Sequence, residues 1–259
     1  MIAPAEYDVI LESKICQESE VCVVITCYNY GYDCIEALDS LTQQTETHSV
    51  IIVDDASTDQ SLDIITRWAA SNDVSKIFAS FRLISHKKNQ GLSQSRNTGI
   101  SLTKSPYIFI LDADNQLYPK ALEELKNAIK ISGYAMSYSI IEKFGDEIGI
   151  LNNQIWEPEL FAYGNYIDAM AMIKREILEE IGGYRKMPDN FGWEDYDLWC
   201  SMVDRGYRGC YVPKILCRYR VRGFSMLNSL TNKYLEQNYS KILKFFQKNH
   251  PNIDFKFKI

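Results

Sequence analysis

A strand, a polar loop and a helix recur four times before residue 133, and this repeat constrains the fold more than any other feature. The strands cover residues 21–27, 50–53, 81–84 and 107–111. They are apolar on both faces, which is typical of strands buried inside a parallel sheet. The order predicts an α/β fold with a mostly parallel central sheet, right-handed crossovers and helices on both faces.

The regular repeat stops near residue 133. Residues 134–170 hold short strand-like pieces and aromatic-rich loops. Helical spacing returns at 173–181, where two glycines end the helix, and at 195–205. A last amphipathic helix is predicted over about 230–248.

The net charge, the hydropathy and the cysteine pattern argue against a nucleic-acid-binding, a membrane-spanning or a secreted protein. The net charge over 259 residues is −6, whereas a nucleic-acid-binding protein usually carries a basic face. No apolar run approaches the roughly 20 residues of a transmembrane segment, and the N-terminus lacks a secretory signal. The seven cysteines form no C-x-x-C pair, which favours a reducing compartment. We expect a cytoplasmic protein without a nucleic-acid partner, and peripheral association with the inner face of a membrane stays open.

Polar residues follow each of the four predicted strands. In open α/β sheets, ligands bind outside the carboxyl ends of the strands, so these residues should line one crevice. The candidates at the strand ends and in the third loop are Thr26, Tyr28, Asn29, Asp55, Arg96, Asp112 and Asp114.

Asp112-x-Asp114 comes directly after a buried strand. Residues i and i+2 of an extended segment project to the same side, so the two carboxylates can hold a hard cation such as Mn²⁺ or Mg²⁺. Such a cation would neutralise a diphosphate and help it leave. The alternative is an ordinary turn, in which aspartate is common.

An acidic motif, Trp193-Glu194-Asp195-Tyr196-Asp197, enters the second of the later helices. Acids in a first helical turn are stabilised by the helix dipole, and this alternative accounts for Asp197. It does not account for the pair Glu194 and Asp195 beside tryptophan. Aromatic walls raise the pKa of a carboxyl group, which suits a general base.

For the other candidate residues, a structural explanation stands beside the predicted binding role. Tyr28 either stacks on a base or packs at a rim, and Arg96 either contacts a diphosphate or base or is a solvated helix residue. Asp55 is expected to accept a hydrogen bond from a base or sugar, whereas residues 57–59 are expected to be structural, with Ser57 or Asp59 capping the next helix. The histidines lack metal-ligand spacing and receive no role.

These blocks together resemble family 2 glycosyltransferases, the inverting enzymes of the GT-A fold. The resemblance runs from about Val21 to Met226. The blocks that carry it are VCVVITCYNYG, VIIVDDASTDQS, NQGLSQSRNTGI, LDADN and GWEDYDLW, in this order, with GGYR before the last.

The resemblance implies a nucleotide-sugar donor, with a UDP-sugar favoured. Thr26 and Tyr28, followed by Asn29 in the first nucleotide loop, would line the uridine pocket, and Asp55 would hydrogen-bond the uracil. The remaining implied contacts are Arg96 near the base or diphosphate, Asp112 at the ribose or a metal-bound water, and Asp114 on the metal.

The resemblance also implies an inverting hexosyl transfer. Asp195, with Glu194 beside it, would deprotonate the hydroxyl of a glycan or glycoconjugate acceptor. Polysaccharide assembly is the expected setting. One departure is Arg222, which stands where many relatives carry a metal-binding histidine. Arginine cannot ligate a metal, but it can clamp a diphosphate, so metal dependence could be partial.

The expected organisation is a leader at 1–20 that hangs free or packs late, followed by two halves that share one core. These are a nucleotide-sugar-binding half at 21–132 and an acceptor-binding, catalytic half at 133–226. A C-terminal helical tail covers 227–259. The alternative function is a non-catalytic nucleotide-sugar-binding module of a larger synthase. A sugar nucleotidyltransferase is disfavoured because no Gly-rich basic loop follows the first strand.

Overall fold

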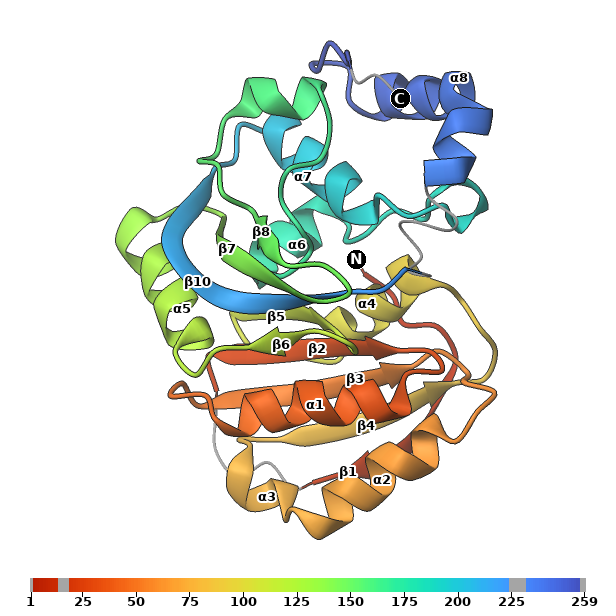
Figure 1. Cartoon of the computed structure of the whole chain (residues 1–259), viewed down its shortest axis with the longest axis vertical. Helices are drawn as coiled ribbons and strands as arrows, with labels where there is room; N and C mark the ends of the chain where they lie inside the picture. Colours follow the sequence, from red (N-terminus) through yellow and green to blue (C-terminus); the bar gives the residue numbers. More distant parts are fainter. Residues whose placement is uncertain (1, 14–18, 224–231, 257–259) are drawn as a thin grey trace.

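The computed structural model describes residues 2–13, 19–223 and 232–256. Within these residues ten strands join one sheet, in the order β1-β4-β3-β2-β5-β9-β7-β10-β6, with β8 paired to β7 (Figure 1). The four predicted strands are confirmed as β2 (Val21–Cys27), β3 (His48–Asp54), β4 (Phe81–His86) and β5 (Tyr107–Asp112). They pair in parallel, as their two-sided apolar pattern predicts.

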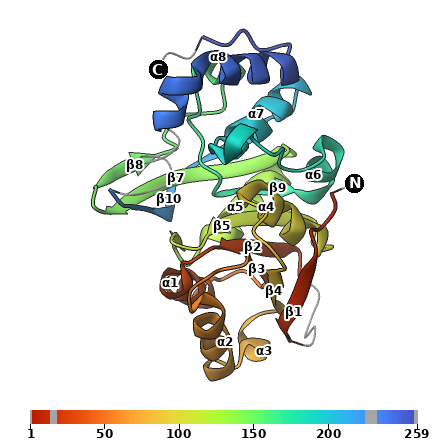
Figure 2. The same ribbon diagram turned by 90° about the vertical axis from the view of Figure 1, so that its right-hand side faces the viewer.

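Helices cover both faces of this sheet (Figure 2). One face packs against α1 (Gly31–Thr42), α2 (Ser61–Ser71) and α5 (Ala121–Ser132), and their apolar residues form one cluster with the inner residues of β2 and β3. The other face packs against α4 (Leu92–Ser101), α6 (Arg175–Ile181) and α7 (Glu194–Asp204). The short helix α3 (Val74–Ile77) precedes β4. The predicted arrangement is therefore confirmed.

Strands from the second half of the chain extend the same sheet. The elements are β6 (Gln116–Leu117), β7 (Met136–Gly145), β8 (Gly149–Leu151), β9 (Ala171–Lys174) and β10 (Gly209–Val221). Strand β9 runs antiparallel to both β5 and β7 and connects the two parts. The long strand β10 is strongly bent, with register shifts between Val212 and Cys217, and this bend carries its end back toward β6 (Figure 1).

The helix predicted over 173–181 is wrong in its first two residues. Ile173 belongs to β9 and lies between Met136 and Ile108 with no exposed surface. Tertiary pairing on both sides overrides the local helical spacing. The helix α6 then ends at Gly182 in the left-handed conformation, as expected.

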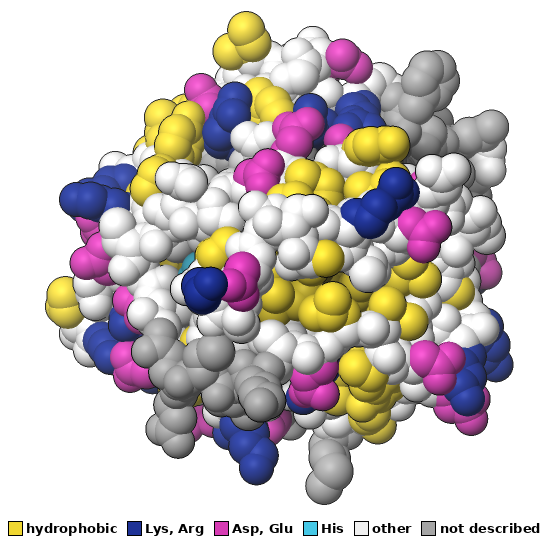
Figure 3. All heavy atoms as spheres, turned by 90° about the horizontal axis from the view of Figure 1, so that it is seen from below, with side chains coloured by type: hydrophobic (Ala, Val, Ile, Leu, Met, Phe, Trp, Pro, Cys, Tyr) yellow, Lys and Arg dark blue, Asp and Glu magenta, His cyan; other side chains and the backbone are white. Residues whose placement is uncertain are grey.

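The segment predicted as a leader contributes an edge strand instead of hanging free. Strand β1 (Tyr7–Glu12) pairs antiparallel with β4. Val9 and Ile10 are exposed on this edge, and Asp8 and Glu12 stand beside them. Figure 3 views the molecule from this end and shows hydrophobic surface interrupted by charged side chains, which discourage edge-to-edge pairing.

The remaining elements close the side of the molecule near α7. Two short 3₁₀ turns, Pro158–Ala162 and Pro188–Asn190, flank the loops around it, and α8 (Asn232–Asn249) packs over α7. The predicted boundary between 226 and 227 lies outside the described residues. In the described part of the chain, no helix is long and apolar enough to cross a membrane.

Gly99 lets α4 approach β2 closely. A Cβ atom at this position would lie 2.3 Å from Cγ1 of Val24, far inside normal contact. The close approach matters for the site because α4 carries Arg96 at its first turns.

We expect Gly99→Ala to lower the free energy of unfolding by roughly 1–3 kcal/mol, the usual cost of overpacking. At an open helix position the same change would stabilise by about 1 kcal/mol. Urea denaturation measures the difference. In a Val24→Ala background, which removes the clashing methyl group, the substitution should be much less harmful. Equal losses in both backgrounds would contradict the close packing.

Candidate active site

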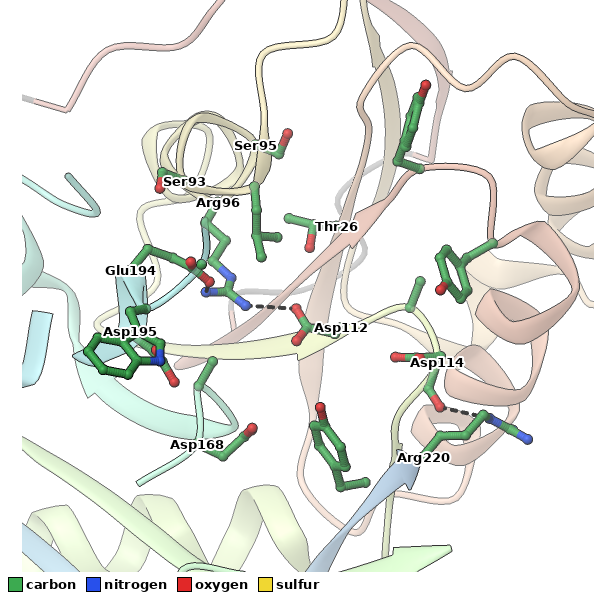
Figure 4. Close-up of a pocket in the computed structure, with 18 of the residues that line it drawn as sticks. Thr26, Ser93, Ser95, Arg96, Asp112, Asp114, Asp168, Glu194, Asp195 and Arg220 are labelled. Atoms are coloured by element: carbon green, nitrogen blue, oxygen red, sulfur yellow. Dashed lines mark hydrogen bonds and ion pairs between the residues drawn. The ribbon is translucent and has the colours of Figure 1, made fainter. Parts of the chain in front are cut away.

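One large cavity, of about 900 Å³, opens at the carboxyl ends of β2, β3 and β5 (Figure 4). The start of α7 and the end of β10 form its other walls. Asp114 and Asp195 therefore share one cavity, although 80 residues lie between them in the sequence. The predicted residues that line it are Thr26, Tyr28, Asp55, Arg96, Asp112, Asp114, Glu194, Asp195 and Arg222.

Asn29 is the predicted site residue that the structure does not bring to the cavity. Its side chain accepts a hydrogen bond from the Thr58 N–H at 2.8 Å, and its own N–H donates to Ser57 Oγ at 2.9 Å. Asn29 adopts a positive φ of 61°, which turns its side chain toward the second loop. Its role in the structure is to join the first two loops.

Thr26 and Tyr28 stand at the end of β2 and line the cavity. Thr26 is nearly buried, whereas 44% of Tyr28 is exposed. An exposed ring at the rim is free to stack on a planar base, so the predicted stacking role of Tyr28 stays a prediction.

Asp55 organises the loop before α4. Its Oδ1 accepts hydrogen bonds from Gln90 N–H at 2.8 Å and pairs with His86 Nδ1 at 2.7 Å, while its Oδ2 accepts from Gly91 N–H at 2.8 Å. Oδ2 keeps room for one more donor. The expected hydrogen bond to a base is compatible with this geometry and stays a prediction. His86 supports the carboxylate, a role that its sequence spacing did not indicate.

Ser57 and Asp59 have structural roles, but the predicted side-chain cap is wrong. The N-cap residue of α2 is Gln60, which makes no side-chain capping hydrogen bond, and Ser57 Oγ accepts from the Asn29 N–H instead. The Ser57 N–H donates to Asp54 Oδ2 at 3.1 Å, and the Asp59 carboxylate accepts from the Ser61 N–H at 2.9 Å at the start of α2. These contacts shape the second loop. Asp55 is the residue of this loop whose carboxylate lines the cavity.

Arg96 is the central cation of the site, not a solvated helix residue. It is 1% exposed and donates to Asp112 Oδ1 at 2.9 Å and to Glu194 Oε1 at 2.7 Å. Its guanidinium also lies 5.1 Å from the centre of the Tyr184 ring. Burial opposes its charge, but Asp112 and Glu194 together raise the pKa of Arg96 well above its ordinary value. Arg96 thus joins the D-x-D pair to the acidic motif.

Asp112 and Asp114 fit a hard divalent cation. Burial first and the charge of Asp112 second raise the pKa of Asp114 to about 6, so a cation beside it would relieve an unfavourable charge. No cluster of three or more metal-binding side chains occurs among the described residues. Two carboxylates completed by substrate phosphates are the arrangement that Mg²⁺ prefers.

Two arginines at the end of β10 face the D-x-D pair. Arg222 forms an ion pair with Asp33 and lies 5.4 Å from the centre of the Tyr30 ring. Arg220 pairs with Glu36 and donates to the backbone oxygen of Asp114 at 3.1 Å. The charge of Arg222 lowers the pKa of Asp114 against the effect of burial. Two cationic side chains, each paired with an acid of α1, therefore stand beside the D-x-D pair.

Asp195 lies across the cavity at the first turn of α7. Its Oδ2 accepts a hydrogen bond from Asn165 Nδ2 at 2.9 Å. Burial first, then the charges of Glu194 and Asp168, raise the pKa of Asp195 to about 8. The expected rise beside an aromatic wall is confirmed in direction. Glu194 is occupied by Arg96, so of these two neighbouring acids Asp195 is the one without an ion pair among the described residues.

Asp197 anchors α7 through side-chain contacts, in addition to any favourable interaction with the helix dipole. It is 2% exposed, forms an ion pair with Arg185, and lies 2.9 Å from His250 Nε2. The second nitrogen of His250 lies 3.1 Å from Asp204. The C-terminal tail therefore supports the helix that presents Asp195, although no sequence spacing indicated His250.

The sequence analysis missed several polar residues of the cavity. They come from the β7–β8 hairpin, the loop before β9 and the end of β10: Asn152, Asn165, Asp168 and Arg220. Burial first, then the charge of Asp112, raise the pKa of Asp168 to about 7. A polar Asp168 directly before the apolar run 169–173 was a signal that a search of strand starts would have found.

A mostly parallel sheet whose central strand ends in a D-x-D pair, facing a half-buried carboxylate across one cavity, is the arrangement of GT-A glycosyltransferases. The chain belongs to glycosyl transferase family 2, whose profile matches residues 22–185. The match ends before the acidic motif. Within the chain's relatives, the Putative glycosyltransferase EpsE of Bacillus subtilis is 28% identical over 211 residues, which is 78% of this chain and 73% of that protein.

Another relative is the Succinoglycan biosynthesis protein ExoU of Rhizobium meliloti, 25% identical over 82% of this chain and 65% of that protein. Some relatives are longer, since the chain covers 32% of an uncharacterized glycosyltransferase of Rickettsia bellii.

Solved structures share the fold. The S. aureus TarS fragment in complex with UDP-GlcNAc matches with a TM-score of 0.72 and 15% identity, over 91% of this chain and 68% of that chain. The mannosyltransferase PcManGT of Pyrobaculum calidifontis, in complex with GDP-Man and Mn²⁺, matches with a TM-score of 0.63 and 21% identity, over 88% of this chain and 65% of that chain. The predicted GT-A fold is confirmed.

We expect Asp195→Asn to stabilise the fold at high pH. Because the pKa of Asp195 is raised to about 8, the folded chain holds the proton more tightly than the unfolded chain does. Its contribution to stability is complete below the unfolded pKa of about 4 and is lost as the pH rises through 8. The neutral amide avoids this loss, so the unfolding temperature at pH 9 should rise by a few degrees.

The difference should shrink toward zero near pH 4. Asp63→Asn, an exposed change on α2, is the matched control and should shift the unfolding temperature little at either pH. Identical unfolding temperatures of Asp195→Asn and the unmodified chain at pH 9 would contradict the raised pKa of Asp195.

Proposed function

We propose that the chain transfers a hexosyl group from a nucleotide-diphosphate donor to an acceptor hydroxyl with inversion, and that the donor is a UDP-sugar. One observation carries the proposal. The D-x-D carboxylates and Asp195 face each other across a single cavity of about 900 Å³, which is large enough for a nucleotide sugar.

The nucleotide side of the cavity supplies contacts of the right chemistry. Tyr28 offers an exposed ring for a base, and Asp55 keeps one acceptor position. Asp112 and Asp114 would hold Mn²⁺ or Mg²⁺, which neutralises the diphosphate when it is bound. Arg222 and Arg220 add positive charge beside the same carboxylates, so part of the diphosphate charge is met by the chain itself.

The opposite wall supplies the base. A carboxyl group with a pKa near 8 is a stronger base than an ordinary aspartate once it has lost its proton, and Asn165 holds it in one orientation. Asp195 would take the proton of the acceptor hydroxyl. The oxygen would then attack the anomeric carbon from the face opposite the diphosphate, which inverts its configuration. An α-linked donor would give a β-linked product.

Polysaccharide or glycoconjugate assembly is the setting that we propose. The name of one relative refers to succinoglycan biosynthesis. A cytoplasmic location, with peripheral association at the inner face of a membrane, is part of the same proposal.

We expect Asp195→Asn to lower turnover by roughly 10²–10⁴-fold, the usual contribution of a general base. The amide keeps the shape of the side chain, so donor affinity should stay within about twofold. Release of UDP from a panel of UDP-sugars, with the exposed-site variant Asp63→Asn as control, measures turnover. Wild-type-like turnover would remove Asp195 from the mechanism. Donor binding without any nucleotide release by the unmodified chain would favour a non-catalytic binding module.

We expect Asp114→Ala to weaken UDP binding roughly tenfold or more when Mn²⁺ is present, because the cation bridges protein carboxylates and phosphates. Calorimetric titrations with and without Mn²⁺ separate this effect from a general loss of affinity. Without the metal the variant should bind UDP at least as well as the unmodified chain, because a like charge has been removed. Equal affinity of Asp114→Ala and the unmodified chain for UDP in the presence of Mn²⁺ would count against Asp114 as a metal ligand.

A further inference from the structure

We propose that Asn152 and Asp168 together recognise one hydroxyl group of the donor sugar and so determine which sugar is transferred. This proposal rests on the proposed function and deepens it. Neither residue belongs to the strand-end motifs or to the acidic motif, and both line the cavity.

Two hydrogen bonds fix Asp168 and leave one of its carboxylate oxygens open to a ligand. Its backbone N–H donates to Asn152 Oδ1 at 2.8 Å, and its own Oδ1 accepts from the Met170 N–H at 2.9 Å. No hydrogen bond from the described residues reaches its Oδ2. In Figure 4 the Asp168 carboxylate points into the cavity, on the side of Asp195 and opposite Asp112.

Asn152, whose side chain holds the Asp168 backbone, carries an unpaired donor. The residue is 4% exposed, yet its Nδ2 has no hydrogen-bond partner among the described residues. Its Oδ1 is fixed by the Asp168 N–H, so rotation of the amide would break an existing bond. A positive φ of 53° holds its backbone in the left-handed region. A buried N–H without an acceptor is costly, and a bound hydroxyl would supply one.

The pair matches a hydroxyl group and not an anion. A hydroxyl both donates and accepts, so it can donate to Asp168 Oδ2 while it accepts from Asn152 Nδ2. An anionic group would be repelled, because Asp168 already lies close enough to the negative charges of Asp112 and Asp114 for them to raise its pKa. A neutral, hydroxyl-bearing sugar ring is the ligand that satisfies both groups.

The position of the pair favours the donor sugar over the acceptor. The diphosphate would lie at Asp112 and Asp114, and the acceptor hydroxyl must meet Asp195, so the donor sugar fills the space between them. Asp168 leads directly into β9, in the middle of the sheet, and faces that space. Asn165, which contacts Asp195, lies on an exposed loop where an acceptor can approach.

Asp168→Asn tests the proposal because it keeps the shape and exchanges one acceptor for a donor. Asn152→Gly is a second variant, since glycine tolerates the positive φ at this position. Asp63→Asn on α2 is the control for the loss of one exposed negative charge. Calorimetric titrations with Mn²⁺ would compare UDP and GDP with UDP-glucose, UDP-galactose, UDP-GlcNAc and GDP-mannose.

Both variants should bind the free nucleotide within about twofold of the unmodified chain and the preferred nucleotide sugar roughly tenfold more weakly, because each removes one hydrogen bond to the sugar hydroxyl and leaves its partner unsatisfied. Deoxy analogues of that sugar identify the hydroxyl. For the analogue that lacks it, Asp168→Asn should cause no further loss, since the two changes remove the same contact.

Two results would overturn the proposal while the proposed function stands. One is unchanged affinity of both variants for the preferred nucleotide sugar. The other is an equal loss of affinity for the free nucleotide and for the nucleotide sugar, which would indicate a general structural defect. If the unmodified chain bound no nucleotide and no nucleotide sugar, the proposed function would fall, and this proposal with it.

Discussion

The buried guanidinium of Arg96 holds the site together. It pairs with Asp112 at the end of β5 and with Glu194 at the start of α7, so it joins two parts of the chain that are 82 residues apart, from 112 to 194. Removing one partner of a buried ion pair typically costs 3–5 kcal/mol, because a charge is left without compensation. The strand end and the acidic motif are therefore held facing each other by the fold itself.

This ion triad also divides the roles of two neighbouring acids. Glu194 is bound to Arg96 and keeps its charge paired, whereas Asp195 has a neutral amide as its side-chain neighbour. The C-terminal part of the chain supports this arrangement. Asp197 binds His250, and the aromatic ring of Tyr196 packs on Phe246 of α8. The C-terminal tail belongs to the core that positions the base.

Much of the fold could be predicted, because apolar residues on both faces of a short segment leave few alternatives to a buried parallel strand. The D-x-D pair and Asp195 could be predicted for a related reason, since residues at strand ends and helix starts must meet at one edge of such a sheet. Asn29 was misplaced because its motif does not reveal which way a left-handed residue turns its side chain. The edge strand β1 was missed because an exposed edge lacks a buried apolar pattern.

Asn152 and Asp168 could not be found in this way. They lie in loops without a repeating pattern, and their importance depends on contacts to each other and to residues far away in the chain. The same is true of His86 and His250, whose partners are 31 and 53 residues distant. A partner at such a distance leaves no signature in a short motif.

The sequence by itself determined the order of buried strands, and through it the edge of the sheet at which the acids gather. Local hydrophobic patterning is sufficient for this, because burial of a strand depends mainly on its own side chains. Only the tertiary structure decided which acids are paired, which are desolvated and which hydrogen-bonding groups remain open to a ligand. Ion pairing and pKa values depend on distance in space, and in this chain the groups that set them come from β5, α4, α7 and the loop before β9.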